Sequence, residues 1–520
     1  MTSRTSSCLV AAGLVSLLGC GGKNTEEALG DAGLVAAIDA GTHEQRDAGT
    51  GGAEDAGSTP FDAGIELHDA GSAPVDAGMP GACGDHVIEG DELCDSAQPV
   101  DCATLGAVWS AGSATCRSDC SGYDVTGCSI GAQKNETIYP ASRDARWSKA
   151  QCNDQTPFAF QISLAPTRTD KWVVYFEGGG NCDGKYNPCG GRGVGLISTK
   201  GYPADRSNSY TTSLGVILSR DPDINPMFFD ANFAFGNYCS SDGWSGTNST
   251  PQTVPIKTTT AQWVFTGRNN ARSIAEVLFR NYGLRDGASQ LLVTGNSAGG
   301  VGAFINFDLF ASRMPQSIAN RSIAVLASAA WTDDLFSDPN FTYRGSKMPL
   351  ETIAANIEQI YGFDADPKCL ALAKSKGVPK STCKGGLLNY TAATSAGPVG
   401  WGIRTMVAKN RLDQGALNDY LIPYAETTDS QAIAARADYL TTINQTLEPV
   451  QWLYAPADPQ TNDADANLHG MVVDELVWPY QPPGLPAGQT LKDVVTAFWQ
   501  DATPMRVIYS GEVPHNDRQQ

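Results

Sequence analysis

The sequence predicts an α/β fold for residues 131–520, the part of the chain that carries its candidate chemistry. Two short apolar runs, 172–176 and 291–293, lead directly into glycines, as buried strands that end in tight loops do. The second run continues into Gly-Asn-Ser-Ala-Gly at 295–299 and then into a helix-like stretch at 300–310. Strand, glycine-bounded Ser and helix in this order are typical of the nucleophile elbow of α/β-hydrolases.

Other elements of this region fit the same fold. Residues 270–282 have apolar side chains at helical spacing, and Gly283 is placed to end the helix. Residues 232–235 and 450–454 are two more strand-like runs. We therefore expect an α/β-hydrolase-like domain behind a small module that is rich in disulfides.

The start of the chain predicts export. Within residues 1–20, Arg4 precedes a short apolar run at 9–18 that is too short to span a bilayer. Leu17-Leu18-Gly19-Cys20 resembles the lipobox of bacterial lipoproteins, in which Cys20 becomes the lipidated first residue. Gly21 at the next position resembles lipoproteins sent to the outer membrane. The alternative is an ordinary secretory signal; both place the protein outside the cytoplasm.

Residues 21–82 predict an extended linker. The triplet Asp-Ala-Gly recurs there every seven or eight residues, a regularity that could also suit a calcium-binding solenoid. The residues between the triplets have too few large apolar side chains to bury a core, which favours a disordered, charged spacer.

Residues 83–128 predict a disulfide module. Six cysteines fall within this short segment, and in an exported chain we expect them to form three disulfides, for which fifteen pairings are possible. Zinc is the competing interpretation, but there is no CxxC pair and no paired His. The stretch 83–94 resembles short Cys-rich repeats of myxobacterial surface proteins, which suggests a spacer or contact module.

The charge excludes one class of partner. The net charge is −20, but residues 1–130 hold 20 Asp and Glu against 4 Lys and Arg, and the remainder holds 36 against 32. A part so close to neutral, without a basic run, has no field that gathers nucleic acid phosphates. We expect no nucleic acid partner.

The elbow predicts Ser297 as a nucleophile, which needs a base oriented by a carboxylate. Only His469 and His515 lie in the catalytic part, and the chain order Ser, acid, His favours His515. Asp458 follows the strand-like run 450–454 and is the preferred acid. Its rivals are Asp333, Asp334, Asp463 and Asp465.

The negative charge that develops on an ester carbonyl needs preset N–H donors. The glycines at 178–180 follow the strand at 172–176 and let backbone amides approach a ligand closely. The amide of Ala298, next after the nucleophile, is the second expected donor.

Three motifs then carry a family resemblance. Phe-Glu-Gly-Gly-Gly-Asn-Cys at 176–182, Asn-Tyr-Cys-Ser-Ser-Asp-Gly-Trp-Ser-Gly at 237–246 and Gly-Asn-Ser-Ala-Gly-Gly at 295–300 resemble the pectin acetylesterase family with its Notum-type carboxylesterases. The likeness covers residues 152–515. It implies an α/β-hydrolase-like fold, a Ser-His-Asp triad and no metal or other cofactor.

Carried over by position, the resemblance implies nucleophile Ser297, acid Asp458, base His515 and oxyanion donors Gly179, Gly180 and Ala298. It also implies the disulfides Cys152 with Cys239, Cys182 with Cys189 and Cys369 with Cys383. The chain departs from the family at two places: Gly180-Asn181 stands where many relatives have Trp, and Gln460 comes one position early after Asp458.

The expected function is hydrolysis of acyl esters through an acyl-enzyme, with an O-acetylated polysaccharide such as pectin as the substrate class that the resemblance suggests. Lipid-ester or protein deacylation of the Notum type is a second hypothesis. A third is a non-catalytic, carbohydrate-binding surface protein that has kept the fold.

Overall fold

A computed structural model describes residues 83–96, 98–185, 187, 189–201, 216–331, 350–413, 417, 430–457, 471–473, 477–482 and 484–510. All of them belong to one compact unit, residues 74–520. The predicted signal and linker lie outside the described residues. So do seven candidate residues: Asp333, Asp334, Asp458, Asp463, Asp465, His469 and His515.

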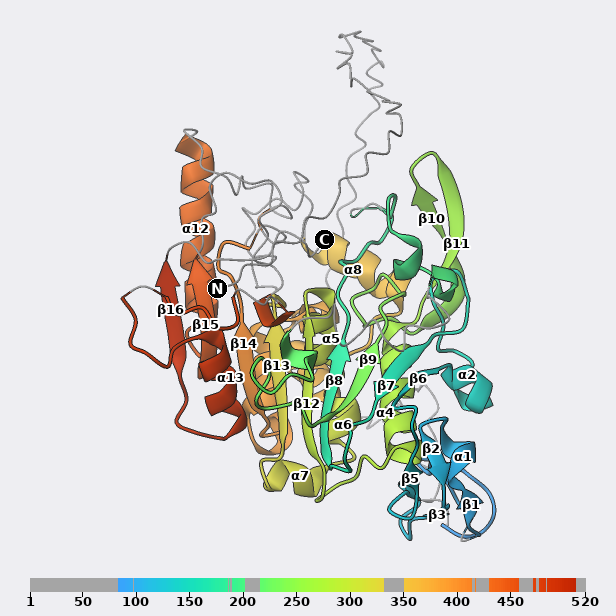
Figure 1. The fold of residues 1–520 in the computed structure, drawn as a ribbon. Helices are drawn as coiled ribbons and strands as arrows, with labels where there is room; N and C mark the ends of the chain where they lie inside the picture. The colour runs from blue at the N-terminus through green and yellow to red at the C-terminus, as the bar shows by residue number, and fades with distance from the viewer. Residues whose placement is uncertain are drawn as a thin grey trace, which may run out of the picture. The chain divides into compact units, whose positions relative to one another are not determined.

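A nine-stranded sheet organises this unit, in the order β16-β15-β14-β13-β12-β8-β9-β7-β6 (Figure 1). Every neighbouring pair from β16 to β9 is parallel, whereas β7 runs antiparallel to both of its neighbours. The strands are β6 (Asn135–Ile138), β7 (Phe160–Ser163), β8 (Lys171–Phe176), β9 (Asn232–Gly236), β12 (Gln290–Asn296), β13 (Ile323–Ser328), β14 (Arg404–Ala408), β15 (Trp452–Ala457) and β16 (Arg506–Ser510).

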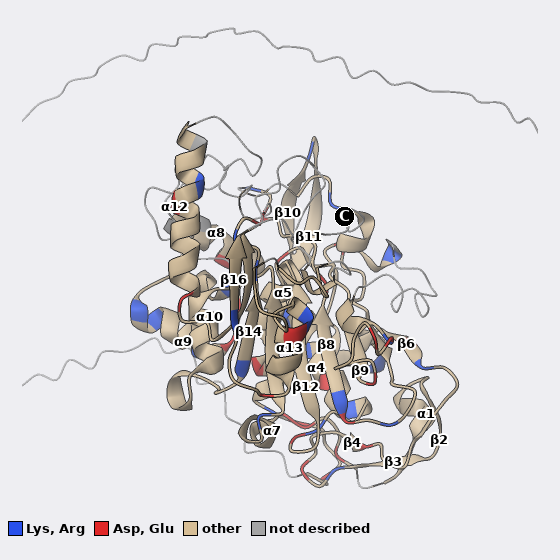
Figure 2. Cartoon of the chain, turned by 60° about the vertical axis from the view of Figure 1, so that its left-hand side comes forward, with Lys and Arg blue, Asp and Glu red and all other residues tan. Residues whose placement is uncertain are grey.

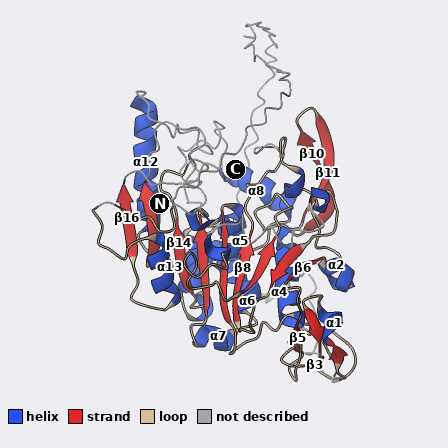
Figure 3. Ribbon diagram, in the orientation of Figure 1, coloured by secondary structure: helices blue, strands red, loops and turns tan. Residues whose placement is uncertain are grey.

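The central strands are uninterrupted apolar runs because both faces of the sheet are covered. Alternate residues of β8 point to opposite faces, so Val174 joins one hydrophobic core and Val173 the other. Figure 3 shows the helices on both sides of the strands. The first core contains residues of α4 (Gly267–Asn281), α5 (Ala298–Asn306), α9 (Pro367–Lys376), α10 (Leu387–Thr394) and α12 (Ser430–Leu447); the second contains α13 (Leu491–Trp499).

The strands and helices that the sequence predicted are confirmed in type. The runs at 172–176, 232–235, 291–293 and 450–454 fall in β8, β9, β12 and β15, and the helix at 270–282 is α4. The stretch after Ser297 divides into α5 and the short α6 (Asp308–Ala311).

Smaller elements complete the unit. The antiparallel hairpin of β10 (Asn248–Ile256) and β11 (Thr259–Phe265) extends away from the main sheet and contacts α8 (Leu350–Tyr361) (Figure 1). The short helices α2 (Pro140–Arg143) and α7 (Pro315–Ala319) lie at the periphery. Among the described helices, none combines the length and apolar character that a bilayer crossing requires.

The Cys-rich segment forms the three bridges that its composition predicted. They join Cys83 to Cys120, Cys94 to Cys116 and Cys102 to Cys128. Small elements surround them: β1 (Val100–Asp101), α1 (Cys102–Leu105), β2 (Trp109–Ala111), β3 (Ser113–Cys116), β4 (Tyr123–Asp124) and β5 (Ser129–Ile130). Asp95 lies beside the first bridge, but both sulfurs there are already bonded to each other and cannot serve as thiolate ligands.

This module packs directly on the end of α4. The Trp109 ring stacks on Tyr282 with 6.3 Å between ring centroids, and its Nε1 donates to the Asn281 carbonyl at 3.2 Å. At Gly122 an added Cβ would lie 2.0 Å from the carbonyl oxygen of Phe279. The module therefore shares the first core with the domain that contains the main sheet, and it is a contact module instead of a separately packed one.

A buried ion cluster is formed by residues of α4, α6 and the N-terminus of α9. Arg268, which is 3% exposed, donates to both carboxylate oxygens of Asp308 at 2.8 and 2.6 Å. Asp366 is buried nearby, where it caps α9 and accepts from the indole of Trp401 at 2.9 Å. Burial, followed by repulsion from Asp308, raises the pKa of the Asp366 carboxyl to about 6.

That shift predicts a pH-dependent stability difference. The folded pKa of Asp366 lies above the unfolded value of about 3.9. The stability that the protonated carboxyl contributes to the fold is therefore present near pH 4 and is lost as the pH rises through 6. Asp366→Asn keeps a capping oxygen and removes the buried charge, so we expect it to stabilise the fold by roughly 2 kcal/mol at pH 7.5 and not at pH 4. Chemical denaturation at both pH values measures this.

The matched variant Asp308→Asn breaks the two-pronged contact with Arg268 and should destabilise the protein at both pH values. An Asp366→Asn variant with the same stability difference at pH 4 and pH 7.5 would show that the Asp366 carboxyl does not titrate in this range.

Candidate active site

Ser297 occupies a strained turn between β12 and α5. Its backbone has φ 57° and ψ −127°, a conformation that L-residues adopt rarely. The turn is fixed on both sides, because the Ser297 amide donates to the Ser328 carbonyl at 2.9 Å and the Ser297 carbonyl accepts from Val301 at 3.0 Å. The sequence-predicted elbow is present, with Ser297 at the carboxyl end of the central strand.

The glycines around Ser297 are required by close approach. An added Cβ at Gly299 would lie 1.9 Å from the Phe176 carbonyl oxygen, and one at Gly295 would lie 2.3 Å from the Gly299 carbonyl oxygen. Both obstacles are backbone atoms that cannot move aside. Because these glycines have no side chains, the end of β8 can lie against the turn that carries Ser297.

The loop after β8 borders Ser297 directly. An added Cβ at Gly178 would lie 3.1 Å from the Ser297 Cβ. Gly179 and Gly180 have φ 139° and 68°, values that suit glycine. Within the described part of the chain, no hydrogen-bond acceptor faces the amides of Gly179, Gly180 or Ala298. These amides are the three that the sequence singled out.

Side chains from other segments hold this loop. The indole Nε1 of Trp244 donates to the Glu177 carbonyl at 3.0 Å, and the Glu177 carboxylate accepts from the amide of Tyr238 at 2.8 Å. Arg192 donates to the Gly179 carbonyl at 2.8 Å. Sequence reasoning missed Arg192, which lies twelve residues beyond the glycine run and in no recognisable motif.

The motif at 237–246 supports the glycine loop of the motif at 176–182. Asp242 is fully buried and accepts from the Ser240 hydroxyl at 2.7 Å and from the amides of Trp244 and Gly267 at 2.9 and 2.7 Å. Burial raises the pKa of its carboxyl, while these donors act in the opposite direction. Gly302 leaves room for the Trp244 ring, since an added Cβ there would lie 2.6 Å from it.

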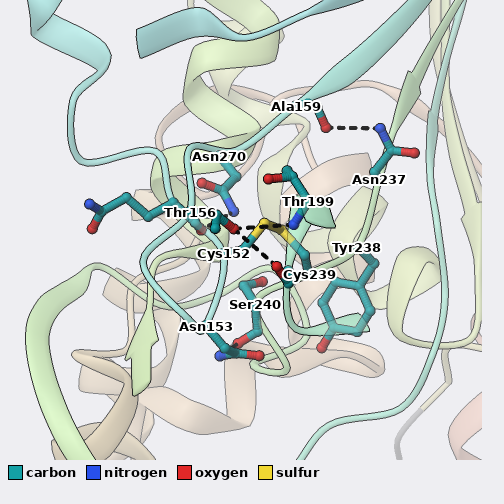
Figure 4. Close-up of a disulfide and its surroundings, with 12 residues drawn as sticks. Cys152, Asn153, Thr156, Ala159, Thr199, Asn237, Tyr238, Cys239, Ser240 and Asn270 are labelled. Carbon is teal, nitrogen blue, oxygen red and sulfur yellow. Dashed lines mark hydrogen bonds between the residues drawn. A yellow bond between two sulfur atoms is a disulfide. The ribbon is translucent and has the colours of Figure 1, made fainter. Parts of the chain in front are cut away.

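A disulfide anchors this scaffold. Cys152 is bonded to Cys239, and the adjacent Asn153 donates to the carbonyls of Ser240 and Val264 at 2.8 Å each (Figure 4). Two more bridges join Cys182 to Cys189 and Cys369 to Cys383. These are the three pairs that the family resemblance implied.

The predicted acid and base, Asp458 and His515, lie outside the described residues, so they stay predictions. The described residues contain another carboxylate at the same edge of the sheet. Asp413 follows β14, is fully buried, and accepts from the Lys409 ammonium at 2.9 Å. Sequence reasoning missed it because the run 404–408 was not recognised as a strand, although it is uninterruptedly buried.

Strand register shows where Asp413 emerges. Asn296, the residue before Ser297, pairs with Ser328 of β13, and Ser328 pairs with Ala408 of β14. Neighbouring strands lie about 4.8 Å apart, so β14 ends about 10 Å from the elbow strand. Asp413 follows five residues beyond Ala408. In open α/β sheets, reactive groups gather outside the carboxyl ends of the strands.

A mostly parallel sheet with a strained Ser between its central strand and a helix defines an α/β-hydrolase-like fold. A family profile described as Pectinacetylesterase matches residues 135–335, a range that contains Ser297 and the glycine loop. The inactive palmitoleoyl-protein carboxylesterase notum1b of Danio rerio is 39% identical over 109 residues, which cover 20% of this chain and 71% of that protein. The chain therefore belongs to the pectinacetylesterase family, with Notum-type relatives.

Further similar proteins support the same family and fold. Palmitoleoyl-protein carboxylesterase NOTUM of Homo sapiens is 32% identical over 188 residues, which cover 35% of this chain and 34% of the human protein. The chain thus spans about a third of the length of such relatives. A crystal structure titled as the Wnt deacylase Notum from Drosophila has a TM-score of 0.54 at 20% identity, covering 70% of this chain and 94% of that one. This likeness supports the fold.

Proposed function

We propose that this protein is a serine carboxylesterase with Ser297 as its nucleophile. The observation that carries the proposal is the strained Ser297 backbone, held between β12 and α5 and bordered by the glycine loop at Gly178. Strain of this kind persists where the surroundings enforce it, and it gathers at reactive sites. The names of the Notum-type relatives support the same chemistry.

In the proposed reaction, the Ser297 hydroxyl attacks the ester carbonyl while a His takes its proton. The amides of Gly179, Gly180 and Ala298 receive the negative charge on the carbonyl oxygen, where each donor is worth roughly 2.7–4 kcal/mol. The His then protonates the leaving alcohol, and an acyl-Ser297 ester remains. Water, deprotonated by the same His, releases the acid and restores the hydroxyl.

For the acid we propose Asp413 over the sequence-predicted Asp458. In α/β-hydrolases the acid and then the His follow the nucleophile along the chain. Asp413 follows β14, two strands from β12, and is buried with a cation at 2.9 Å that favours the charged carboxylate. Asp458 follows β15, one strand further away.

For the base, the same reasoning supports His469. His515 follows the edge strand β16, which lies four strands or about 19 Å from β12 and one strand further away than β15. His469 follows β15, and only Gly470 separates it from Met471. Met471 shares a core with Leu292 of β12, and its 3-10 turn (Met471–Val473) contacts that strand.

As substrate we propose a small acyl ester, such as acetyl, on a carbohydrate. The loop beside Ser297 is open, because Gly179 and Gly180 are exposed, and its rim carries the guanidinium of Arg192 and the amide of Asn181. A polar rim suits a hydrated sugar. The second hypothesis is palmitoleoyl-protein deacylation, the activity in the relatives' names. The third hypothesis is a non-catalytic surface protein.

Acyl-chain preference tests these alternatives. We expect the purified protein to hydrolyse p-nitrophenyl acetate with a kcat/KM at least tenfold above that for the octanoate, because Gly180 and Asn181 stand where many relatives have Trp. Steady-state rates for both esters measure this. The opposite order would favour a lipid deacylase. Absence of both hydrolysis and fluorophosphonate labelling would favour a binding protein.

The proposed location is outside the cell, with a lipid anchor at Cys20. Six disulfides in the described part of the chain suit an oxidising compartment. Lys and Arg are interspersed with Asp and Glu along the described segments in Figure 2.

A further inference from the structure

The glycine loop beside Ser297 has one peptide that lies between two residues without side chains. Because Gly179 and Gly180 are consecutive and lack Cβ atoms, no Cβ of their own restricts the orientation of the peptide between them. Rotation by half a turn would exchange the Gly180 N–H for the Gly179 carbonyl oxygen. A carbonyl directed at the oxyanion would repel it instead of stabilising it.

Arg192 contacts this peptide from one side. Its guanidinium donates to the Gly179 carbonyl at 2.8 Å, and its second terminal nitrogen lies 3.7 Å from where a Gly180 Cβ would stand. In a trans peptide, the carbonyl and the following N–H point in opposite directions. Holding the Gly179 carbonyl toward Arg192 therefore directs the Gly180 N–H away from Arg192.

Arg192 is itself well fixed. Its guanidinium lies 5.9 Å from the centroid of the Tyr238 ring, and the Tyr238 hydroxyl accepts from the Gly243 amide at 2.6 Å. The segment that leads to Arg192 is closed by the Cys182–Cys189 bridge. Within that segment, the Asn187 amide donates to the Asn181 carbonyl at 2.6 Å.

A second peptide of the loop is held in the same way. The Glu177 carbonyl accepts from Trp244, so the peptide before Gly178 is also fixed through its oxygen. Two side chains from separate segments thus orient alternate peptides of one loop. Trp244 belongs to a motif shared with relatives, whereas Arg192 follows the disulfide loop.

We propose that Arg192 is a positioning residue, which holds the Gly179–Gly180 peptide with its N–H directed at the oxyanion of the transition state. The inference rests on the proposed esterase function and on Gly180 as a donor. It assigns no contact with the substrate to Arg192. Its effect should appear in kcat and leave KM unchanged, since the oxyanion exists only in the transition state.

The test compares full-length wild type with Arg192→Met, Arg192→Lys and the same-loop control Val194→Ala, whose side chain is 58% exposed. With p-nitrophenyl acetate, Arg192→Met should lower kcat at least tenfold and change KM less than twofold. Arg192→Lys, which keeps one donor, should recover part of the loss, and Val194→Ala should match wild type. Affinity for a trifluoromethyl ketone, which forms a tetrahedral adduct with Ser297, should fall by the same factor as kcat.

Three results would overturn the inference: a kcat within twofold of wild type in Arg192→Met, a change confined to KM, or an unchanged affinity for the ketone. If Arg192→Met does not fold, the lysine variant decides, because it must then show a lower kcat and ketone affinity at wild-type KM. Wild-type hydrolysis in the same assay reports on the proposed function. Its absence would overturn both proposals, whereas an active wild type with indifferent Arg192 variants would overturn this one alone.

Discussion

Ser297→Ala should lower the kcat for p-nitrophenyl acetate by roughly 10⁴- to 10⁶-fold, because removal of the nucleophile leaves only binding and the oxyanion donors. Fluorophosphonate labelling should disappear with it. Steady-state rates and labelling of wild type and variant provide the measurement.

Ser297→Gly should be equally inactive but more stable than wild type. Glycine adopts φ 57° and ψ −127° without the cost of a Cβ, and backbone strain of this kind costs roughly 1–3 kcal/mol. We therefore expect a higher melting temperature for the glycine variant than for either wild type or the alanine variant. The surface control Ser312→Ala should be indistinguishable from wild type. Retained hydrolysis in both Ser297 variants would remove the basis of the proposed mechanism.

The second large effect concerns the acid and the base. Asp413→Asn and His469→Ala should each lower kcat by roughly 10⁴-fold, whereas Asp458→Asn and His515→Ala should stay within about tenfold of wild type. The reason is distance from β12. Asp413 follows β14, which lies one strand nearer to β12 than β15, the strand before Asp458. His469 follows β15, which lies one strand nearer to β12 than β16, the strand before His515. Rates of the four single variants separate the pairs.

Asp413 also forms a buried ion pair, and that contact needs its own control. Lys409→Met breaks the same pair from the other side and leaves the carboxylate in place. If Asp413 only stabilises the fold, both variants should lose stability and activity alike. If it orients the base, the loss of kcat in Asp413→Asn should greatly exceed that in Lys409→Met at comparable melting temperatures. Inactive Asp458 and His515 variants beside active Asp413 and His469 variants would restore the sequence-based triad.

Family membership does not replace these measurements. One relative, covered over 71% of its length, carries the word inactive in its name, and the family profile ends at residue 335, before every candidate acid and base except Asp333 and Asp334. The elbow and glycine loop lie within the matched range. Activity depends as well on residues beyond it, which is why the nucleophile and the later residues are tested separately.

The elbow at Ser297 and the disulfide content of the front module could be predicted from the sequence, because each depends on residues close together in the chain. A strand, small residues and a helix around one Ser require no knowledge of the rest of the fold. Cysteine density in an exported segment similarly indicates bridges. The pairing of Cys83 with Cys120 could not be chosen among fifteen possibilities, since it depends on how the module's short strands fold together.

The sequence by itself determined the strained turn at Ser297, the glycine loop and the type of the main strands and helices, because local spacing and backbone sterics dictate them. Only the tertiary structure decided that the module shares a core with α4, that Arg192 reaches the Gly179 carbonyl, and that Asp413 emerges two strands from Ser297. Those relations depend on strand order across the sheet, which places residues distant in the chain side by side. The physical reason is that burial on both faces requires each strand to be apolar, which its own sequence shows. Which strands lie side by side depends instead on the packing of the whole domain.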